Sequence, residues 1–202
     1  MRITGGRFGG RHLQMPKGPT IRPTLDQVRQ ALFNLLGEKI KGARVLDLFS
    51  GTGALGIEAL SRGASHVTFV ERSFFCVQTI EENLKTLSFE RGSPQITIIR
   101  AEAVTGIRKL VREEALFDLV FLDPPYGHRW VRISLNALTQ YAIVSDAGLV
   151  VSEQDKRDPL PPLVEGKEAR LVLKRHQRYG DTVLAFYERQ SALKLTSTVC
   201  VL

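Results

Sequence analysis

Strand-like and helix-like segments alternate along most of this chain, and the alternation restricts the folds that it can adopt. Short apolar runs typical of buried strands are separated by longer segments whose apolar residues recur at helical spacing. Because parallel strands need long crossover connections, repeated units of this kind predict an α/β fold built on a doubly wound, mostly parallel sheet. The expected strands are residues 44–48, 66–71, 95–100, 118–122, 148–152, 169–173 and 182–187, and the expected helices between the first five strands are residues 54–62, 74–87, 103–113 and 130–141.

The two ends of this pattern differ from its middle. A first helix is expected to start after Pro23, where Thr24 and Gln27 form a capping box, and to stop at Gly37. The last two strands have no helix between them, so they are expected to form an antiparallel hairpin that completes a seven-stranded sheet. We therefore divide the chain into an N-terminal arm (1–22), a main domain (23–190) and a C-terminal tail (191–202).

The composition is that of a globular protein able to bury a core. The chain has 202 residues, of which 43% are hydrophobic and 24% charged, enough for one domain with a small appendage. Neither a signal peptide nor an apolar run long enough to cross a bilayer is evident, so we expect a cytoplasmic protein with no membrane partner. Cys76, Cys200 and the four scattered histidines show no metal-ligand spacing, so no metal site is expected.

Positive charge is concentrated near both ends of the chain. The net charge is +7; residues 1–22 hold five basic residues and no acid, and residues 167–178 hold five more against one acid. Such clusters suit a polyanion, although solvated side chains on exposed loops would give the same pattern. The Gly- and Arg-rich start is expected to form a loose β-hairpin arm, too rich in glycine to build core. The residues expected to contact nucleic acid are Arg2, Arg7, Arg11, Arg22, Lys174 and Arg175.

A glycine-rich turn follows the first expected strand and indicates a cofactor site. Gly51 and Gly53 let the backbone approach a ligand closely, and Glu71 ends the next strand, where an acid can accept both hydroxyls of a ribose. Asp47 lies just before the glycines, where it would repel a pyrophosphate and attract an ammonium or sulfonium group. The two acids therefore favour S-adenosylmethionine over a dinucleotide such as NAD.

Further cofactor contacts are expected at the neighbouring strand ends. Glu102 and Ala103 follow the third strand, where an acid can accept a hydrogen bond from the adenine amine. Phe49, Phe74 and Phe75 would flank the adenine or pack in the core, and both interpretations stay open. The residues assigned to the cofactor are Asp47, Phe49, Gly51, Gly53, Glu71, Arg72, Glu102 and Ala103.

The tetrapeptide Asp123-Pro124-Pro125-Tyr126 follows the fourth expected strand and supplies the catalytic candidates. The carboxyl end of such a strand is where an open α/β sheet holds its ligands. The carboxylate can accept from an exocyclic amine, the two prolines present carbonyls and no backbone donors, and the tyrosine ring can stack on a base. The alternative is an ordinary strand-to-loop turn with a surface tyrosine, and the glycine-rich turn upstream argues against it.

Together these motifs resemble class I S-adenosylmethionine-dependent methyltransferases. More narrowly, the chain resembles the bacterial RsmD-type family that methylates the exocyclic N2 amine of one guanine in 16S ribosomal RNA. The resemblance rests on the Gly- and Arg-rich arm, Arg22-Pro23-Thr24, the 47–56 turn, Glu71 and residues 123–126, and it extends to about Arg189. It implies the cofactor S-adenosylmethionine, a 16S rRNA partner within the small subunit or an assembly intermediate, and a monomeric enzyme.

Two other functions stay open at this point. The Asp-Pro-Pro-Tyr motif also occurs in adenine-N6 methyltransferases that act on RNA or DNA, so it does not by itself choose the base. A chain of 202 residues holds no sizeable extra domain for reading a duplex, which favours the guanine-specific family. The third function is a non-catalytic RNA-binding assembly factor, and the presence of both the cofactor acids and the amine-binding residues argues against it.

Overall fold

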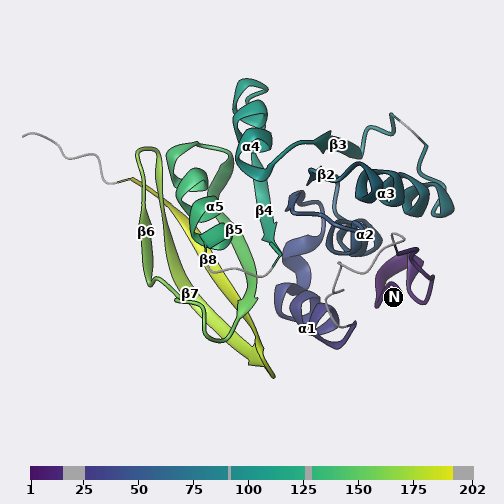
Figure 1. The fold of residues 1–202 in the computed structure, drawn as a ribbon, viewed down its shortest axis with the longest axis horizontal. Helices are drawn as coiled ribbons and strands as arrows, with labels where there is room; N and C mark the ends of the chain where they lie inside the picture. Colours follow the sequence, from purple (N-terminus) through teal and green to yellow (C-terminus); the bar gives the residue numbers. More distant parts are fainter. Residues whose placement is uncertain (16–25, 91, 126–128, 193–202) are drawn as a thin grey trace, which may run out of the picture.

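The computed structural model describes residues 1–15, 26–90, 92–125 and 129–192, and it shows an eight-stranded sheet flanked by helices (Figure 1). Its strands are β1 Arg44–Leu48, β2 His66–Glu71, β3 Ile96–Arg100, β4 Phe117–Leu122, β5 Val144–Asp155, β6 Leu163–Glu165, β7 Ala169–Tyr179 and β8 Thr182–Ser191. Its helices are α1 Asp26–Leu36, α2 Ala54–Ser61, α3 Phe74–Thr86, α4 Ala103–Arg112 and α5 Arg129–Gln140, with short 3-10 turns η1 Gly6–Phe8 and η2 Gly37–Ile40. Across the sheet the strand order is β3-β2-β1-β4-β5-β8-β7-β6.

The predicted doubly wound α/β architecture is confirmed. Strands β1 to β5 pair in parallel: β1 with β2 and β4, β2 with β3, and β4 with β5. β7 and β8 form the predicted antiparallel hairpin, which joins the parallel part through the antiparallel pair β5–β8. The carboxyl ends of β1 to β5 therefore lie at the same edge of the sheet, which we call the carboxyl edge.

The sheet has eight strands where the sequence predicted seven. The additional strand is β6, which has three residues and pairs antiparallel with β7 at the edge of the sheet. A strand of this length is too short to show an alternating pattern, so local sequence carried no signal for it. β5 and β7 are also longer than expected: backbone pairing with β8 holds residues 153–155 and 175–179, and Val144 at the start of β5 pairs with β4.

Helices cover both faces of the sheet, and each face has its own apolar core. Successive residues of a strand point to opposite faces, so Val45 of β1 packs with α1, α2 and α3 while Leu46 packs with α4 and α5. On the first face Phe33 of α1 contacts Phe121 of β4 edge to face, at 5.6 Å between ring centroids. Within the described ranges no helix is long and apolar enough to cross a membrane.

The N-terminal segment, residues 1–15, is part of the folded core, and here the sequence-based expectation was wrong. Ile3 and Leu13 are 1% and 5% exposed and belong to the apolar core on the α1–α3 face. The segment turns back on itself through an antiparallel bridge between Arg2 and His12 and the 3-10 turn η1, which is looser than a two-stranded hairpin. Its glycines form the turn, but the apolar residues on either side are enough to anchor it.

A buried carboxylate also ties the N-terminal segment to the main domain. Glu58 of α2 is completely buried; its oxygens accept from the Thr4 N–H at 2.7 Å, the Thr4 hydroxyl at 2.8 Å and the Arg62 guanidinium at 2.7 Å. The buried guanidinium of Arg29 in α1 approaches the same carboxylate to 3.6 Å. Because a buried charge is tolerated only when it is fully paired, Glu58 holds the segment firmly against α1 and α2.

Candidate cofactor and substrate site

Acidic side chains gather at the carboxyl edge, on strands that are neighbours in the sheet. Asp47 of β1 lies opposite Phe69 of β2 and Phe121 of β4, and Glu71 is the last residue of β2. Asp123 follows directly after β4, and its charge is close enough to Asp47 to raise the pKa of that carboxyl. Three acids far apart in sequence thus meet at one place, where open α/β sheets bind ligands.

The glycine-rich turn between β1 and α2 has a backbone that only a few residue types adopt easily. Gly51 and Gly53 have φ angles of 53° and 78°, in the left-handed region. A Cβ on Gly53 would lie 3.1 Å from Ile80 of α3, whereas a Cβ on Gly51 would meet one atom of the described residues within 4 Å, the Phe49 carbonyl oxygen at 3.9 Å. The turn is therefore packed against α3 on one side and open to a ligand at Gly51.

Glu71 has a structural role that the sequence did not reveal. One carboxylate oxygen accepts the Gly51 N–H at 2.9 Å, and the other accepts the Ser73 N–H at 2.8 Å. Glu71 thus fixes the glycine-rich turn and the start of α3 at the same time. A carboxylate oxygen has two lone pairs, so each oxygen can still accept one ligand hydroxyl.

Asp47 is the buried anchor of the site. It is 1% exposed, and its carboxylate accepts the Gly56 N–H of α2 at 2.9 Å. Burial raises the pKa of Asp47 from 3.8 to about 8, and the nearby charges of Asp123 and Glu71 add to the shift. At neutral pH the carboxyl is therefore largely protonated, and a cation placed beside it would favour the ionised form.

The remaining expected cofactor residues lie around these acids. The Arg72 guanidinium contacts the Glu102 carboxylate at 3.3 Å, and Ala103 is buried at the start of α4. Phe74 and Phe75, at the start of α3, are 51% and 71% exposed, so they are not core residues. The core interpretation is therefore wrong for this pair, and their contact with a ligand stays a prediction.

The catalytic candidates are only partly described. Asp123 and Pro124 are half-buried, and Pro125 is exposed. Phe49 and Asp123 directly follow Leu48 and Leu122, which are paired neighbours on β1 and β4. The ring of Phe49 contacts Trp130 of α5 edge to face, at 6.4 Å between ring centroids. Tyr126, Arg22 and the capping residue Thr24 lie outside the described residues.

Exposed basic residues on β7 lie level with the carboxyl edge. Across the sheet, Leu122 of β4 pairs with Ser152 of β5, which pairs with Ala185 of β8, which in turn pairs with His176 of β7. Strands are spaced by about 4.8 Å, so this level of β7 lies roughly 14 Å from β4. The β7–β8 hairpin continues past the end of β4 (Figure 1). The exposed residues on this stretch are Lys174, Arg175, His176, Gln177 and Arg178.

Two further exposed arginines lie near the catalytic candidates in sequence and were assigned no role from the sequence. Arg129 and Arg132 are exposed on the first turn of α5, directly after the stretch that holds the catalytic candidates. α5 also packs against β7. The signal available in the sequence was their position, because they follow the Asp-Pro-Pro-Tyr motif within six residues of Tyr126.

The basic residues of the N-terminal segment lie at a different place. Arg7 stacks over the rings of Phe8 and Phe89, at 4.3 Å and 5.2 Å from the ring centroids, and Arg11 donates to the Thr86 carbonyl at 3.2 Å. The Phe8 N–H donates to Ser61, the last residue of α2, about 12 Å along that helix from the glycine-rich turn. Arg2 approaches Asp26 at 3.9 Å, a partner that is distant in sequence.

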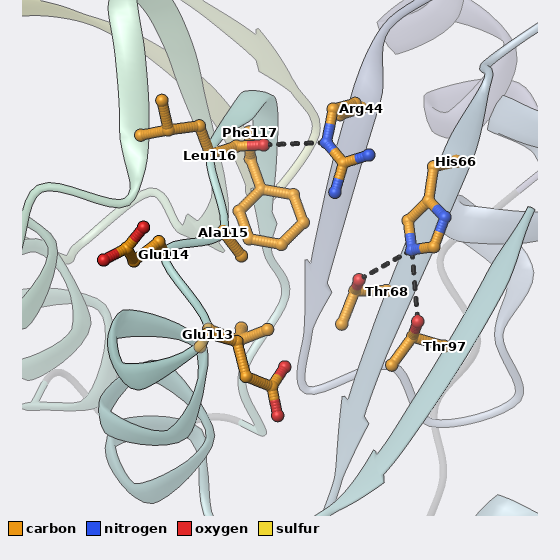
Figure 2. A pocket seen from close by; sticks show the side chains of 10 residues that line it. Arg44, His66, Thr68, Thr97, Glu113, Glu114, Ala115, Leu116 and Phe117 are labelled. Carbon is orange, nitrogen blue, oxygen red and sulfur yellow. Dashed lines mark hydrogen bonds between the residues drawn. The ribbon is translucent and has the colours of Figure 1, made fainter.

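A pocket of about 390 Å³ opens at the opposite edge of the sheet, where β1 and β2 begin (Figure 2). His66 donates from Nδ1 to the Pro94 carbonyl at 2.9 Å, so its Nε2 accepts from the hydroxyls of Thr68 and Thr97 at 3.3 Å and 3.2 Å. Burial lowers the pKa of His66, which keeps the ring neutral. Arg44 also donates to the Leu116 carbonyl at 3.1 Å, so the side chains on the β1–β2 side of the pocket are already hydrogen-bonded, and we assign this pocket no ligand.

The chain is similar to known proteins over nearly its whole length. YlbH of Bacillus subtilis (strain 168) is 37% identical over 190 residues, covering 94% of this chain and 100% of the relative. Ribosomal RNA small subunit methyltransferase D of Escherichia coli (strain K12) is 33% identical over 191 residues, covering 95% and 91%. The solved structure of yhhF from Escherichia coli superposes with a TM-score of 0.80 at 31% identity, covering 95% of this chain and 99% of yhhF.

The sheet order, the glycine-rich turn and the acidic carboxyl edge define a Rossmann-like methyltransferase. Within that class, the family described as "Conserved hypothetical protein 95" matches residues 1–188. The chain belongs to this family, and the resemblance drawn from its motifs is confirmed.

Proposed function

We propose that the protein transfers a methyl group from S-adenosylmethionine to the exocyclic N2 amine of a guanine in 16S ribosomal RNA. The observation that carries the proposal is the meeting of Asp47, Glu71 and Asp123 at one edge of the sheet, and we assign the first two to the cofactor and the third to the amine. Relatives at 33% identity over nearly the whole chain that are named as small-subunit rRNA methyltransferases support RNA as the substrate.

The residues fit S-adenosylmethionine in charge and in shape. The buried Asp47 suits its ammonium and sulfonium groups, Glu71 has lone pairs left for the ribose hydroxyls, and the open face of Gly51 lets the ligand approach the backbone. Glu102 and the exposed ring of Phe74 would hold the adenine. When bound, the cofactor supplies an electrophilic methyl group on a sulfonium.

The chain's own residues would prepare the acceptor amine. The lone pair of an exocyclic guanine amine is delocalised into the ring, so the amine is a poor nucleophile. The Asp123 carboxylate and the Pro124 carbonyl would accept hydrogen bonds from its two N–H groups and direct the lone pair toward the cofactor side of the site. As the new N–C bond replaces the sulfonium C–S bond, the amine gives up one proton, for which the Asp123 carboxylate is the nearest proposed acceptor. The ring of Tyr126 would stack on the extruded base. Positioning of this kind supplies much of the acceleration in a group transfer.

One experiment separates this function from its alternatives. The full-length protein is incubated with labelled S-adenosylmethionine and 16S rRNA, either free, in assembly intermediates or in whole small subunits, and the RNA is then digested to nucleosides. We expect label in N2-methylguanosine. Label in N6-methyladenosine would instead establish the adenine-specific alternative, and bound RNA without labelled nucleoside would establish a non-catalytic assembly factor. A substrate in the ribosome also implies that the protein acts in the cytoplasm.

The affinity for S-adenosylmethionine should rise with pH up to about 8. The pKa of Asp47 is raised to about 8, so below that pH a cationic ligand must displace a proton, and affinity falls by up to about tenfold per unit of pH. Asp47→Asn should bind weakly and lose this dependence. Calorimetry between about pH 6 and pH 8 measures both effects. An affinity of the unaltered protein that does not change over this range would contradict the role of Asp47.

The basic stretch of β7 should contribute to the salt dependence of RNA binding. Lys174→Ala combined with Arg175→Ala removes two exposed cations from the part of β7 near the carboxyl edge, so the slope of log affinity against log salt should flatten by about 1.4. Lys109→Ala combined with Arg112→Ala on α4 is the matched control and should leave the slope unchanged. Filter binding at several salt concentrations measures the slope. Equal slopes for the two variants would mean that the β7–β8 hairpin does not contact RNA.

The N-terminal arginines can be tested in the same assay. Replacing Arg2, Arg7 and Arg11 by alanine should flatten the slope by roughly 2 if all three contact phosphates. Substitution is preferable to deletion of the segment, because deletion would also remove Ile3 and Leu13 from the core. A slope like that of the unaltered protein would mean that these arginines only pack against the protein.

A further inference from the structure

Asn83 of α3 is a completely buried polar side chain that joins two distant parts of the protein. Its Oδ1 accepts the Gln14 N–H at 2.7 Å. Its Nδ2 donates to the Gln14 carbonyl at 3.2 Å and to the Thr52 carbonyl at 3.1 Å. Both amide protons and the amide oxygen are therefore used, and each is aimed at the backbone rather than at another side chain.

The two partners of Asn83 belong to the N-terminal segment and to the glycine-rich turn. Gln14 lies near the end of the N-terminal segment, which is anchored elsewhere by Glu58 and Ser61. Thr52 lies between Gly51 and Gly53 and is itself buried. The turn is thus held from two sides, by the Glu71 carboxylate at the Gly51 N–H and by the Asn83 amide at the Thr52 carbonyl.

The contacts with Gln14 fix the orientation of the Asn83 amide. An amide that accepts from one backbone N–H and donates to the carbonyl of the same residue cannot flip without losing both bonds. Its second proton is then directed at Thr52 whenever the N-terminal segment is in place. If the segment moves away, the amide loses two of its three hydrogen bonds and the Thr52 carbonyl loses a fixed donor.

We propose that Asn83 is a positioning residue that couples the N-terminal segment to the cofactor turn, so that ordering of either one favours ordering of the other. The inference rests on the proposed function, because it assigns the turn to S-adenosylmethionine and the segment's arginines to RNA. Coupling of this kind is reciprocal: RNA contacts that hold the segment raise cofactor affinity, and cofactor that orders the turn tightens the segment.

Two measurements without RNA test the coupling, with S-adenosylhomocysteine as the probe. The first is amide hydrogen exchange of residues 11–15 in the unaltered protein, with and without the probe; we expect slower exchange at Gln14 when the probe is bound. The second is calorimetry on Asn83→Ala and on Gln14→Pro, which removes the N–H that Asn83 accepts. Each variant loses about one hydrogen bond that helps to position the glycine-rich turn, which should weaken binding of the probe by up to about tenfold. Asn136→Ala, an exposed asparagine on α5, is the control and should bind normally.

The outcomes distinguish the coupling from the function on which it rests. Unaltered protein that does not bind the probe overturns the proposed cofactor, and the coupling with it. Probe binding with no change in exchange at Gln14, together with normal affinity in Gln14→Pro, overturns the coupling alone. If Asn83→Ala does not fold, these two results still decide, because neither depends on that variant. A purely structural Asn83 would lower the stability of Asn83→Ala while leaving both results at their control values.

Discussion

Asp123→Ala is expected to lower the rate of methyl transfer about a hundredfold to a thousandfold, the scale seen when one preorganised polar group is removed from an active site. In the proposed function the Asp123 carboxylate accepts a hydrogen bond from the target amine, and alanine leaves that N–H group without an acceptor. Cofactor affinity should stay the same or rise slightly, because the charge of Asp123 contributes to the raised pKa of Asp47 and its removal favours ionised Asp47.

The split between rate and affinity makes this test specific. Single-turnover kinetics with saturating cofactor measure the rate, and calorimetry with S-adenosylmethionine measures the affinity. Asp118→Asn is a suitable control, since Asp118 lies on the same strand at the opposite edge of the sheet. A variant at position 123 that keeps most of its activity would remove Asp123 from the mechanism, and the amine would need another acceptor.

Glu71→Ala should show the opposite pattern, with cofactor affinity as the main loss. The substitution removes the acceptor proposed for the ribose hydroxyls, and it also releases the Gly51 and Ser73 N–H groups from the carboxylate that fixes the turn. Hydrogen bonds to a charged group contribute about 1.5–3 kcal/mol each, so a loss of one or two should weaken binding by at least tenfold.

The variant Glu71→Gln helps to separate the two causes. Glutamine keeps one acceptor oxygen for a backbone N–H but loses the charge and the second acceptor, so its affinity should fall between those of the unaltered protein and Glu71→Ala. Glu113→Ala, at the exposed end of α4, serves as the control. Calorimetry on all four proteins gives the comparison. Normal affinity in Glu71→Ala would mean that neither the ribose contact nor the support of the turn matters for binding.

Features encoded by local patterns were predictable from the sequence. The alternation of strand and helix segments determined the doubly wound sheet, because the spacing of apolar residues reports which face of each element is buried. The glycine-rich turn and the Asp-Pro-Pro-Tyr motif identified the carboxyl edge for the same reason, since their position after apolar runs places them at strand ends. These inferences needed only the residues within each segment.

Features that depend on contacts between distant segments were decided by the tertiary structure. β6 exists because β7 offers it backbone partners, and the N-terminal segment is buried because Glu58 and the α1–α3 core receive it. The second role of Glu71 and the bridge through Asn83 depend on which backbone groups the fold brings within 3.2 Å of a side chain. Local sequence does not encode such distances, because they follow from the register of the strands and the packing of helices far apart along the chain.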